Sequence, residues 1–344
     1  MMENSIIYNS ILKKKIKMEA HAMLTADKTN IMKDRTKEIE KMLFETGVCH
    51  LGSGDFYVQN LMMPENSMIV GNGAATRLIL PDSVDEGYVV NLKTCCTVKD
   101  VFFVGSSVDI TLTEQPGERH GIVFEDPSEK PGSEAPSYGT IENCHFRGFS
   151  GGAITCRRTG YDYNDSMNVS DCWITNCGVG INIPFWSEFH RFTNVSVMGC
   201  WYGCINNGGN NMFANCNFSG NEMGLLMDNS RKQSRNETHG SMIGCVFNHS
   251  GHNQGTGIKI LGTRNGFIFS GCQVFYSKIE LDDVHGTVFD SFNFGRHEKI
   301  NITGGGTALF TNCIFGTAPE VTITDNEYTK FVNCYLRSGE AVEI

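Results

Sequence analysis

The chain has 344 residues, a formal net charge of −10 and a hydrophobic fraction of 40%, which is ample for a packed core. Its 38 glycines against 8 prolines indicate turn-rich β-structure, because glycine supplies backbone conformations with positive φ. The acidic balance, without a basic patch along the body, excludes nucleic acid as the main partner. No stretch approaches the length of a membrane span, so no membrane partner is expected.

Residues 1–34 differ from the rest, because they carry a lysine-rich run at residues 13–17 and no alternating strand pattern. We interpret them as a polar, partly helical leader or as a segment that attaches the protein to a larger assembly. Residues 1–8 lack the basic and apolar regions of a signal peptide. The protein is therefore expected to be made in the cytoplasm without a signal peptide.

A short helix is predicted over residues 37–46, whose apolar side chains recur at helical spacing, with Gly47 as its C-cap. Residues 48–58 then read as two short strands around a glycine turn, and residues 68–73 as the strand that completes the unit. An amphipathic helix in this place would cover the open end of a stacked core. We therefore expect it to be a capping helix.

Residues 114–138 hold four of the eight prolines and many charges, which predicts a long loop projecting from the fold near 114–138. Regular repeats follow up to the last residue. The final strand, residues 340–344, stops without a cap. We expect a partner chain or a further domain to cover that end.

One hexapeptide pattern recurs: an apolar residue, any residue, Asn, Asp or Gly, then Cys or another small residue, any residue, and an apolar residue. Copies begin at residues 141, 169, 213, 242, 269, 310 and 331, with degenerate copies at 98, 192 and 288. From residue 144 onward the cysteine position recurs about every 19 to 29 residues, the spacing of a solenoid. Each copy is interpreted as one short strand.

A second strand follows most copies after a glycine-rich turn, for example at residues 152–156, 179–183 and 223–227. One such repeat cannot bury its apolar face alone, whereas stacked repeats share a continuous core with strands about 4.8 Å apart. The pattern therefore predicts an all-β fold, a parallel β-helix over residues 35–344.

Seven of the 14 cysteines stand at the same pattern position: Cys144, Cys172, Cys216, Cys245, Cys272, Cys313 and Cys334. Stacking would place them in an interior column, where free cysteine packs as a small apolar side chain. We predict reduced, buried thiols. No Cys/His spacing fits a zinc site, so no metal and no cofactor are expected. Asp171 and Asp290 stand at the Asn position of the pattern and are predicted to belong to a ladder of turn residues.

The start of the repeats resembles a known family. The predicted helix, the glycine, leucine and aromatic residues of 47–58 and the Ile-x-Gly-x-Gly run at 69–73 are similar to the opening of pectate-lyase-superfamily β-helices. The helix plus cysteine-bearing repeats more closely resembles tail-spike proteins of bacteriophages and prophages of gut bacteria. Over residues 36–344 the resemblance implies a single-stranded right-handed parallel β-helix.

Three insertions follow the second strand of their repeats, at residues 157–166, 184–191 and 228–239, and such loops protrude from one face. Glycoside hydrolysis needs a carboxyl group that donates a proton and a second carboxylate as base or nucleophile. We expect Glu188 to be the donor, since a neighbouring apolar group such as Trp186 raises a carboxyl pKa. Asp228 is the expected second carboxylate.

Substrate contacts are predicted from aromatic faces that stack on sugars and from polar or charged groups in the same insertions. They are Tyr161, Asp162, Tyr163, Asp165, Trp186, His190, Arg191, Arg231, Glu237 and His239. Asp162 and Asp165 alone are weak evidence for calcium. The motifs of polygalacturonases are absent or in the wrong order.

The leading hypothesis is a homotrimeric, tail-spike-like protein that binds a polysaccharide or cell-surface glycan and assembles with virion tail components. Its location would be the virion or the cytoplasm. It would cleave the glycan, as a hydrolase or lyase, through paired carboxylates. The alternatives are a stand-alone polysaccharide-degrading enzyme of the pectate-lyase class, which would carry an export signal, and a non-catalytic structural or adhesive rod.

Overall fold

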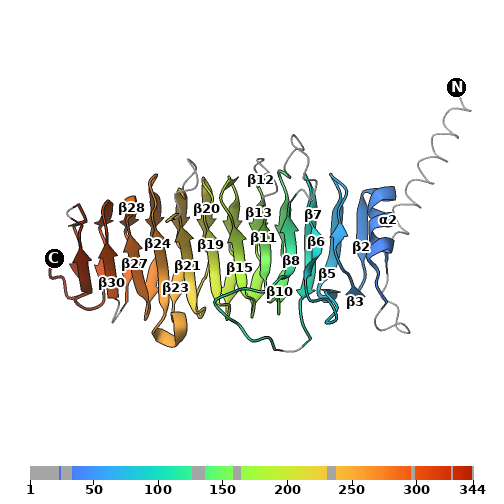
Figure 1. The fold of residues 1–344 in the computed structure, drawn as a ribbon, viewed down its shortest axis with the longest axis horizontal. Helices are drawn as coiled ribbons and strands as arrows, with labels where there is room; N and C mark the ends of the chain where they lie inside the picture. The colour runs from blue at the N-terminus through green and yellow to red at the C-terminus, as the bar shows by residue number, and fades with distance from the viewer. Residues whose placement is uncertain are drawn as a thin grey trace, which may run out of the picture.

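The computed structural model describes residues 23–24, 33–107, 109–125, 136–157, 164–230, 238–295, 299–326 and 328–342. The chain coils into a single-stranded right-handed parallel β-helix, as predicted, and its rungs stack in chain order along one axis (Figure 1). Most of the predicted leader, residues 1–34, lies outside the described residues. No helix of the described part is long and apolar enough to cross a membrane.

One face of the β-helix is an 11-stranded parallel sheet, which contains the predicted second strands. In chain order its strands are β4 (Leu61–Met62), β6 (Gly87–Asn91), β8 (Arg119–Phe124), β11 (Gly152–Cys156), β15 (Val179–Ile183), β19 (Tyr202–Asn206), β21 (Met223–Asp228), β24 (Thr256–Leu261), β27 (Lys278–Asp282), β30 (Lys299–Thr303) and β33 (Glu320–Thr324).

The hexapeptide copies build the other faces, which comprise a 17-stranded and a 5-stranded sheet. The 17-stranded sheet contains β1 (Met23–Leu24), β2 (Val48–Leu51), β3 (Gly54–Tyr57), β5 (Met68–Ile79), β7 (Thr97–Val104), β9 (Thr140–Glu142), β10 (His145–Arg147), β13 (Asn168–Ser170), β14 (Trp173–Thr175), β17 (Arg191–Thr193), β18 (Ser196–Met198), β20 (Asn211–Ala214), β22 (Gly240–Ile243), β25 (Phe267–Ser270), β28 (His285–Asp290), β31 (Thr307–Thr311) and β34 (Lys330–Val332). The 5-stranded sheet contains β23 (Val246–Asn248), β26 (Gln273–Phe275), β29 (Asn293–Phe294), β32 (Ile314–Phe315) and β35 (Tyr335–Leu336). A 3₁₀ turn, η1 (Ser250–Asn253), and a small sheet of β12 (Asn164–Asp165) and β16 (Ser187–Glu188) complete the elements.

Most hexapeptide copies bend at their third residue and are divided there, so the interpretation of one strand per copy is wrong for them. Asn143, for example, has φ of 49° and separates β9 from β10. A positive φ cannot continue a β-strand, and Asn adopts it more readily than most residues. Asp171, with φ of 55°, confirms the predicted ladder. Near Asp290 the residue with positive φ is Ser291, while Asp290 itself accepts a hydrogen bond from Nδ2 of the ladder residue Asn312 at 3.1 Å.

The cysteine column is confirmed, because the seven pattern cysteines are buried and carry free thiols. Each thiol reaches a main-chain carbonyl of the preceding rung: Sγ of Cys245 lies 3.7 Å from the oxygen of Phe213, and Sγ of Cys272 lies 3.3 Å from that of Met242. Burial raises the pKa of the Cys144 thiol well above its ordinary value. The interior therefore holds the Cys144 thiol protonated.

The capping helix is confirmed as α2 (Thr36–Thr46), which covers the N-terminal end of the stack (Figure 1). Ile39 and Leu43 of α2 are buried in the common core. Gly47 ends the helix with φ of 76°, and its N–H donates to the Leu43 carbonyl at 2.8 Å. The helix therefore closes the apolar interior where a first rung would otherwise be open.

The predicted projecting loop near 114–138 is wrong in its middle. Residues 119–124 form β8, and Ile122 pairs in register with Ile154 of β11 inside the 11-stranded sheet. The flanking charges and prolines concealed a short apolar run at residues 121–124. Residues 126–135 lie outside the described part.

Candidate functional site

The outer face of the 11-stranded sheet presents polar side chains in rows. Ile122 and Ile154 are register partners in the buried core, so Val123 and Thr155 project outward by strand alternation. Two residues further on, Arg157 projects outward beside its neighbour in the preceding rung, Glu125. The fold thus brings together two charged residues that lie far apart in the sequence.

Arg157 contacts two carboxylates. Its Nη1 lies 3.8 Å from Oε2 of Glu125, and its Nη2 lies 3.6 Å from Oε2 of Glu118. Glu125 is 8% exposed, whereas the Glu118 side chain is 67% exposed. Two carboxylates that share one guanidinium are no more than roughly 10 Å apart, and paired glycosidase carboxylates lie about 5 to 9.5 Å apart.

His120 lies beside this pair and is buried. Its Nδ1 accepts a hydrogen bond from the Gly152 N–H at 2.9 Å, so the neutral ring carries its proton on Nε2. Nε2 lies 3.5 Å from Oε2 of Glu118. Burial, aided by the charge of Arg157 and opposed by Glu118, lowers the pKa of His120 to about 4. At neutral pH the ring is therefore uncharged, and its Nε2 is buried without a hydrogen-bond partner.

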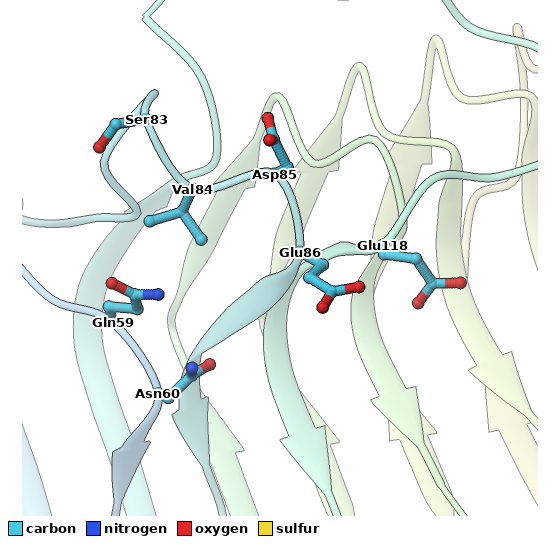
Figure 2. A pocket seen from close by; sticks show the side chains of 7 residues that line it. All are labelled: Gln59, Asn60, Ser83, Val84, Asp85, Glu86 and Glu118. Atoms are coloured by element: carbon cyan, nitrogen blue, oxygen red, sulfur yellow. The ribbon is translucent and has the colours of Figure 1, made fainter.

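Two cavities adjoin along the same face. One, of about 580 Å³, is lined by residues of successive rungs that include Glu118, Glu125 and Arg157. The other, of about 780 Å³, is lined by Asp85, Glu86 and Glu118, among others (Figure 2). Figure 2 shows Glu86 and Glu118 immediately before the neighbouring strands β6 and β8. Glu118 lines both cavities, and we refer to the two together as the groove.

No family model matches the chain, and no curated protein matches it. Among solved structures, the A-module of the mannuronan C-5 epimerase AlgE4 of Azotobacter vinelandii is 12% identical, with a TM-score of 0.59. That match covers 91% of this chain and 97% of the module. This likeness shows that the chain has a parallel β-helix fold.

Two further structures are similar to the β-helix. The catalytic domain of a GH87 α-1,3-glucanase, solved with nigerose, is 12% identical with a TM-score of 0.52, over 92% of this chain and 68% of that domain. The tailspike gp49 of the Acinetobacter baumannii bacteriophage Fri1, a capsular polysaccharide depolymerase, has a TM-score of 0.47 at 14% identity, over 93% of this chain and 56% of that one. At these identities the likeness shows the fold alone, and the tailspike match is too distant to carry an argument.

The two predicted catalytic residues lie in different rungs of the β-helix. Glu188 is 7% exposed, and its Oε2 accepts from Nδ2 of Asn210 at 3.0 Å. Asp228 ends β21 and accepts from the N–H and Oγ of Ser230 at 3.0 and 2.6 Å. The rung of β19 separates them, and no hydrogen bond or ion pair among the described residues joins them. Their catalytic role stays a prediction.

Asp228 nevertheless shares the outer row of Arg157, because strand alternation places both residues outward at the ends of β21 and β11. Its N–H donates to Oδ1 of Asn207 at 2.8 Å, on the intervening strand's end. Asp165 is the residue that the structure brings next to Glu188, as its register partner in β12 and β16. Tyr161, Asp162, Tyr163, Arg231 and Glu237 lie outside the described residues.

His190 has an interior position instead of the predicted substrate contact. It is fully buried, its Nδ1 accepts from the Met167 N–H at 3.0 Å, and its Nε2 lies 2.7 Å from Oγ of Ser187. Burial lowers its pKa to about 3. Arg191 is exposed on β17, in the 17-stranded sheet, whereas Trp186 and His239 are half-buried in the insertions.

Sequence reasoning missed Glu118, His120 and Glu125, which lie in the stretch interpreted as a loop. The sequence signal that could have revealed the strand β8 is the apolar run at residues 121–124, between His120 and Glu125. Of the described residues, no group of three or more His, Cys, Asp or Glu is placed to hold a metal ion.

Proposed function

We propose that the protein is a tail-spike-like, polysaccharide-active β-helix that binds a glycan along the groove of the 11-stranded sheet and hydrolyses it there. The observation that carries this proposal is the pair of carboxylates, Glu118 and Glu125, on the single guanidinium of Arg157. The groove follows the stacking axis, which suits an extended chain of sugars. The fold is also that of the epimerase module and the glucanase domain described above, both of which are polysaccharide enzymes by name.

The two carboxylates have different surroundings, as the two roles in glycoside hydrolysis require. Glu125 is buried and lines the groove, and the carboxyl group in the less solvated surroundings is the one suited to donate the proton to the glycosidic oxygen. Glu118 is exposed, lines both parts of the groove and acts as base or nucleophile. Arg157 places positive charge beside both groups, and Nε2 of His120 lies 3.5 Å from the Glu118 carboxylate.

The charge of the groove favours a neutral glycan. Its described lining contains four carboxylates, Asp85, Glu86, Glu118 and Glu125, and one cationic side chain, Arg157. The nearby Arg119 is engaged by the main chain, since its guanidinium donates to the carbonyls of Leu80 and Pro81 at 3.2 and 3.1 Å. A uronate polymer would meet repulsion here, and β-elimination acts on uronates, so hydrolysis is the favoured reaction.

The test is a comparison of neutral glucans, α-1,3-glucan among them, with mannuronan and other uronate polymers. New reducing ends and the ultraviolet absorbance of unsaturated uronates are measured for the wild type, Glu118→Gln and the control Glu142→Gln, an exposed residue of β9. We expect reducing ends from a neutral glycan, lost in Glu118→Gln and kept in the control. Unsaturated products would overturn the hydrolytic assignment. Glycan binding without any release of reducing ends would overturn the enzymatic function and favour a non-catalytic adhesive rod.

A further inference from the structure

The small sheet of β12 and β16 stacks two carboxylates outside the groove. Asp165 and Glu188 are register partners in parallel strands of adjacent rungs. Side chains at one register position of parallel strands project to the same side, at the spacing of neighbouring strands, about 4.8 Å. Neither residue is among those that line the two groove cavities.

Both carboxylates have a buried oxygen without a hydrogen-bond partner. These oxygens are Oδ1 of Asp165 and Oε1 of Glu188, and the Glu188 residue is only 7% exposed. No lysine, arginine or histidine of the described chain forms an ion pair with either group. Burying a charged oxygen without a partner is costly, and two neighbouring carboxylates also repel each other. The arrangement therefore lacks a positive partner.

Asn210, from the next rung, supplies the remaining polar group. Its Nδ2 donates to Oε2 of Glu188 at 3.0 Å, which directs the other oxygen of that carboxylate elsewhere. Hard divalent cations bind carboxylate, amide and main-chain oxygens together with water, so two carboxylates suffice for a weak site. A soft or nitrogen-preferring metal has no suitable ligand in this set.

We propose that Asp165 and Glu188 bind a calcium ion between the two rungs, through Oδ1 of Asp165 and Oε1 of Glu188. The ion links β12 and β16 and so stabilises this part of the β-helix. With two carboxylates the affinity falls in the range of weak extracellular sites, with a Kd of about 10⁻⁴ to 10⁻³ M. The proposal is independent of the hydrolytic function, because it concerns binding and stability alone.

The test uses the full chain, with calcium chloride as the probe, in isothermal calorimetry and in thermal unfolding with and without EDTA. The variants are Asp165→Asn and Glu188→Gln, and the control is Glu142→Gln. We expect saturable binding to the wild type and control, weakened at least tenfold in both variants. Calcium should raise the Tm of the wild type and control more than that of the variants.

The variants Asp165→Asn and Glu188→Gln also allow a prediction for the protein without calcium. In EDTA both variants should unfold at a Tm equal to or above that of the wild type, because each substitution removes the repulsion between the paired carboxylates. A wild type whose Tm and calorimetry do not respond to calcium would overturn the proposal. So would calcium binding that both variants retain in full, or a Tm that depends on pH through a shared proton and not on calcium.

Discussion

Nη1 of Arg157 lies 3.8 Å from Oε2 of Glu125, across two neighbouring rungs on the outer face of the 11-stranded sheet. The same guanidinium meets Glu118 at 3.6 Å from its other nitrogen. One arginine thus holds an exposed and a buried carboxylate at the floor of a groove.

Replacing Arg157 by alanine should impair both catalysis and stability. Glu125 would lose its ion pair with Arg157, and losing one partner of a fully buried pair costs about 3 to 5 kcal/mol and less here, because Arg157 is partly exposed. We expect a lower midpoint in urea unfolding and a loss of reducing-end release. Arg147→Ala is the matched control, since Arg147 forms an exposed ion pair with Asp109. Equal effects of the two substitutions would contradict the assigned role.

The buried His190 should make folding stability depend on pH. Its folded pKa is lowered from 6.5 to about 3, so between these values the unfolded chain binds a proton that the folded chain does not. Stability is therefore fully present above pH 6.5 and falls as the pH drops toward 3, by up to about 1.4 kcal/mol per pH unit.

The variant His190→Asn isolates this dependence, because the Asn oxygen can replace Nδ1 as the acceptor for Met167. Unfolding by urea between pH 4 and 7 should give a flatter pH dependence for the variant than for the wild type. Parallel curves would show that His190 does not titrate as its burial requires.

The thiol column predicts the accessibility of the cysteines. Cys95 is exposed, whereas the other 13 cysteines are buried, and all 14 carry free thiols. An aromatic disulfide reagent should modify one thiol rapidly in the native protein and 14 after unfolding in guanidinium. Cys95→Ser should abolish the rapid reaction. Several fast-reacting thiols, or fewer than 14 after unfolding without reductant, would contradict a reduced interior column.

The turn ladder makes a prediction about side-chain type. Asn215 has φ of 54°, a conformation that glycine adopts freely and alanine does not. Asn215→Ala should therefore lower the free energy of unfolding by about 1 to 2 kcal/mol, and Asn215→Gly by less. Chemical denaturation of both variants measures the difference. If glycine were the more damaging substitution, backbone conformation would not explain the Asn at this position.

The fold could be predicted because its signal is repeated. The Asn-Cys pattern recurs in rung after rung, and stacking is the one arrangement that buries every copy. The prediction of one unbroken strand per copy is wrong, because apolar residues alternate in the same way before and after the bend and so do not reveal it. The bend lies at the Asn position, for which the pattern predicts a ladder of turn residues, as the positive φ of Asn143 shows.

The groove could not be predicted in the same way, because its residues come together through register. Glu125 and Arg157 become neighbours only when Phe124 pairs with Cys156. Glu118 and Glu125 also lie in a charged, proline-rich stretch, where β8 is a single short apolar run. The insertions, by contrast, are visible in the sequence. In the structure, two of their residues, Asp165 and Glu188, are register partners.

The central claim is that the carboxylates on Arg157 cleave the glycan, and the most direct measurement is reducing-end release by Glu125→Gln beside Glu188→Gln and Asp228→Asn. We predict that Glu125→Gln lowers release at least about a hundredfold while retaining glycan binding, and that the other two variants keep most of the activity. The claim would be contradicted if Glu125→Gln released reducing ends at the wild-type rate while Glu188→Gln or Asp228→Asn released none. That result would place the chemistry in the insertions.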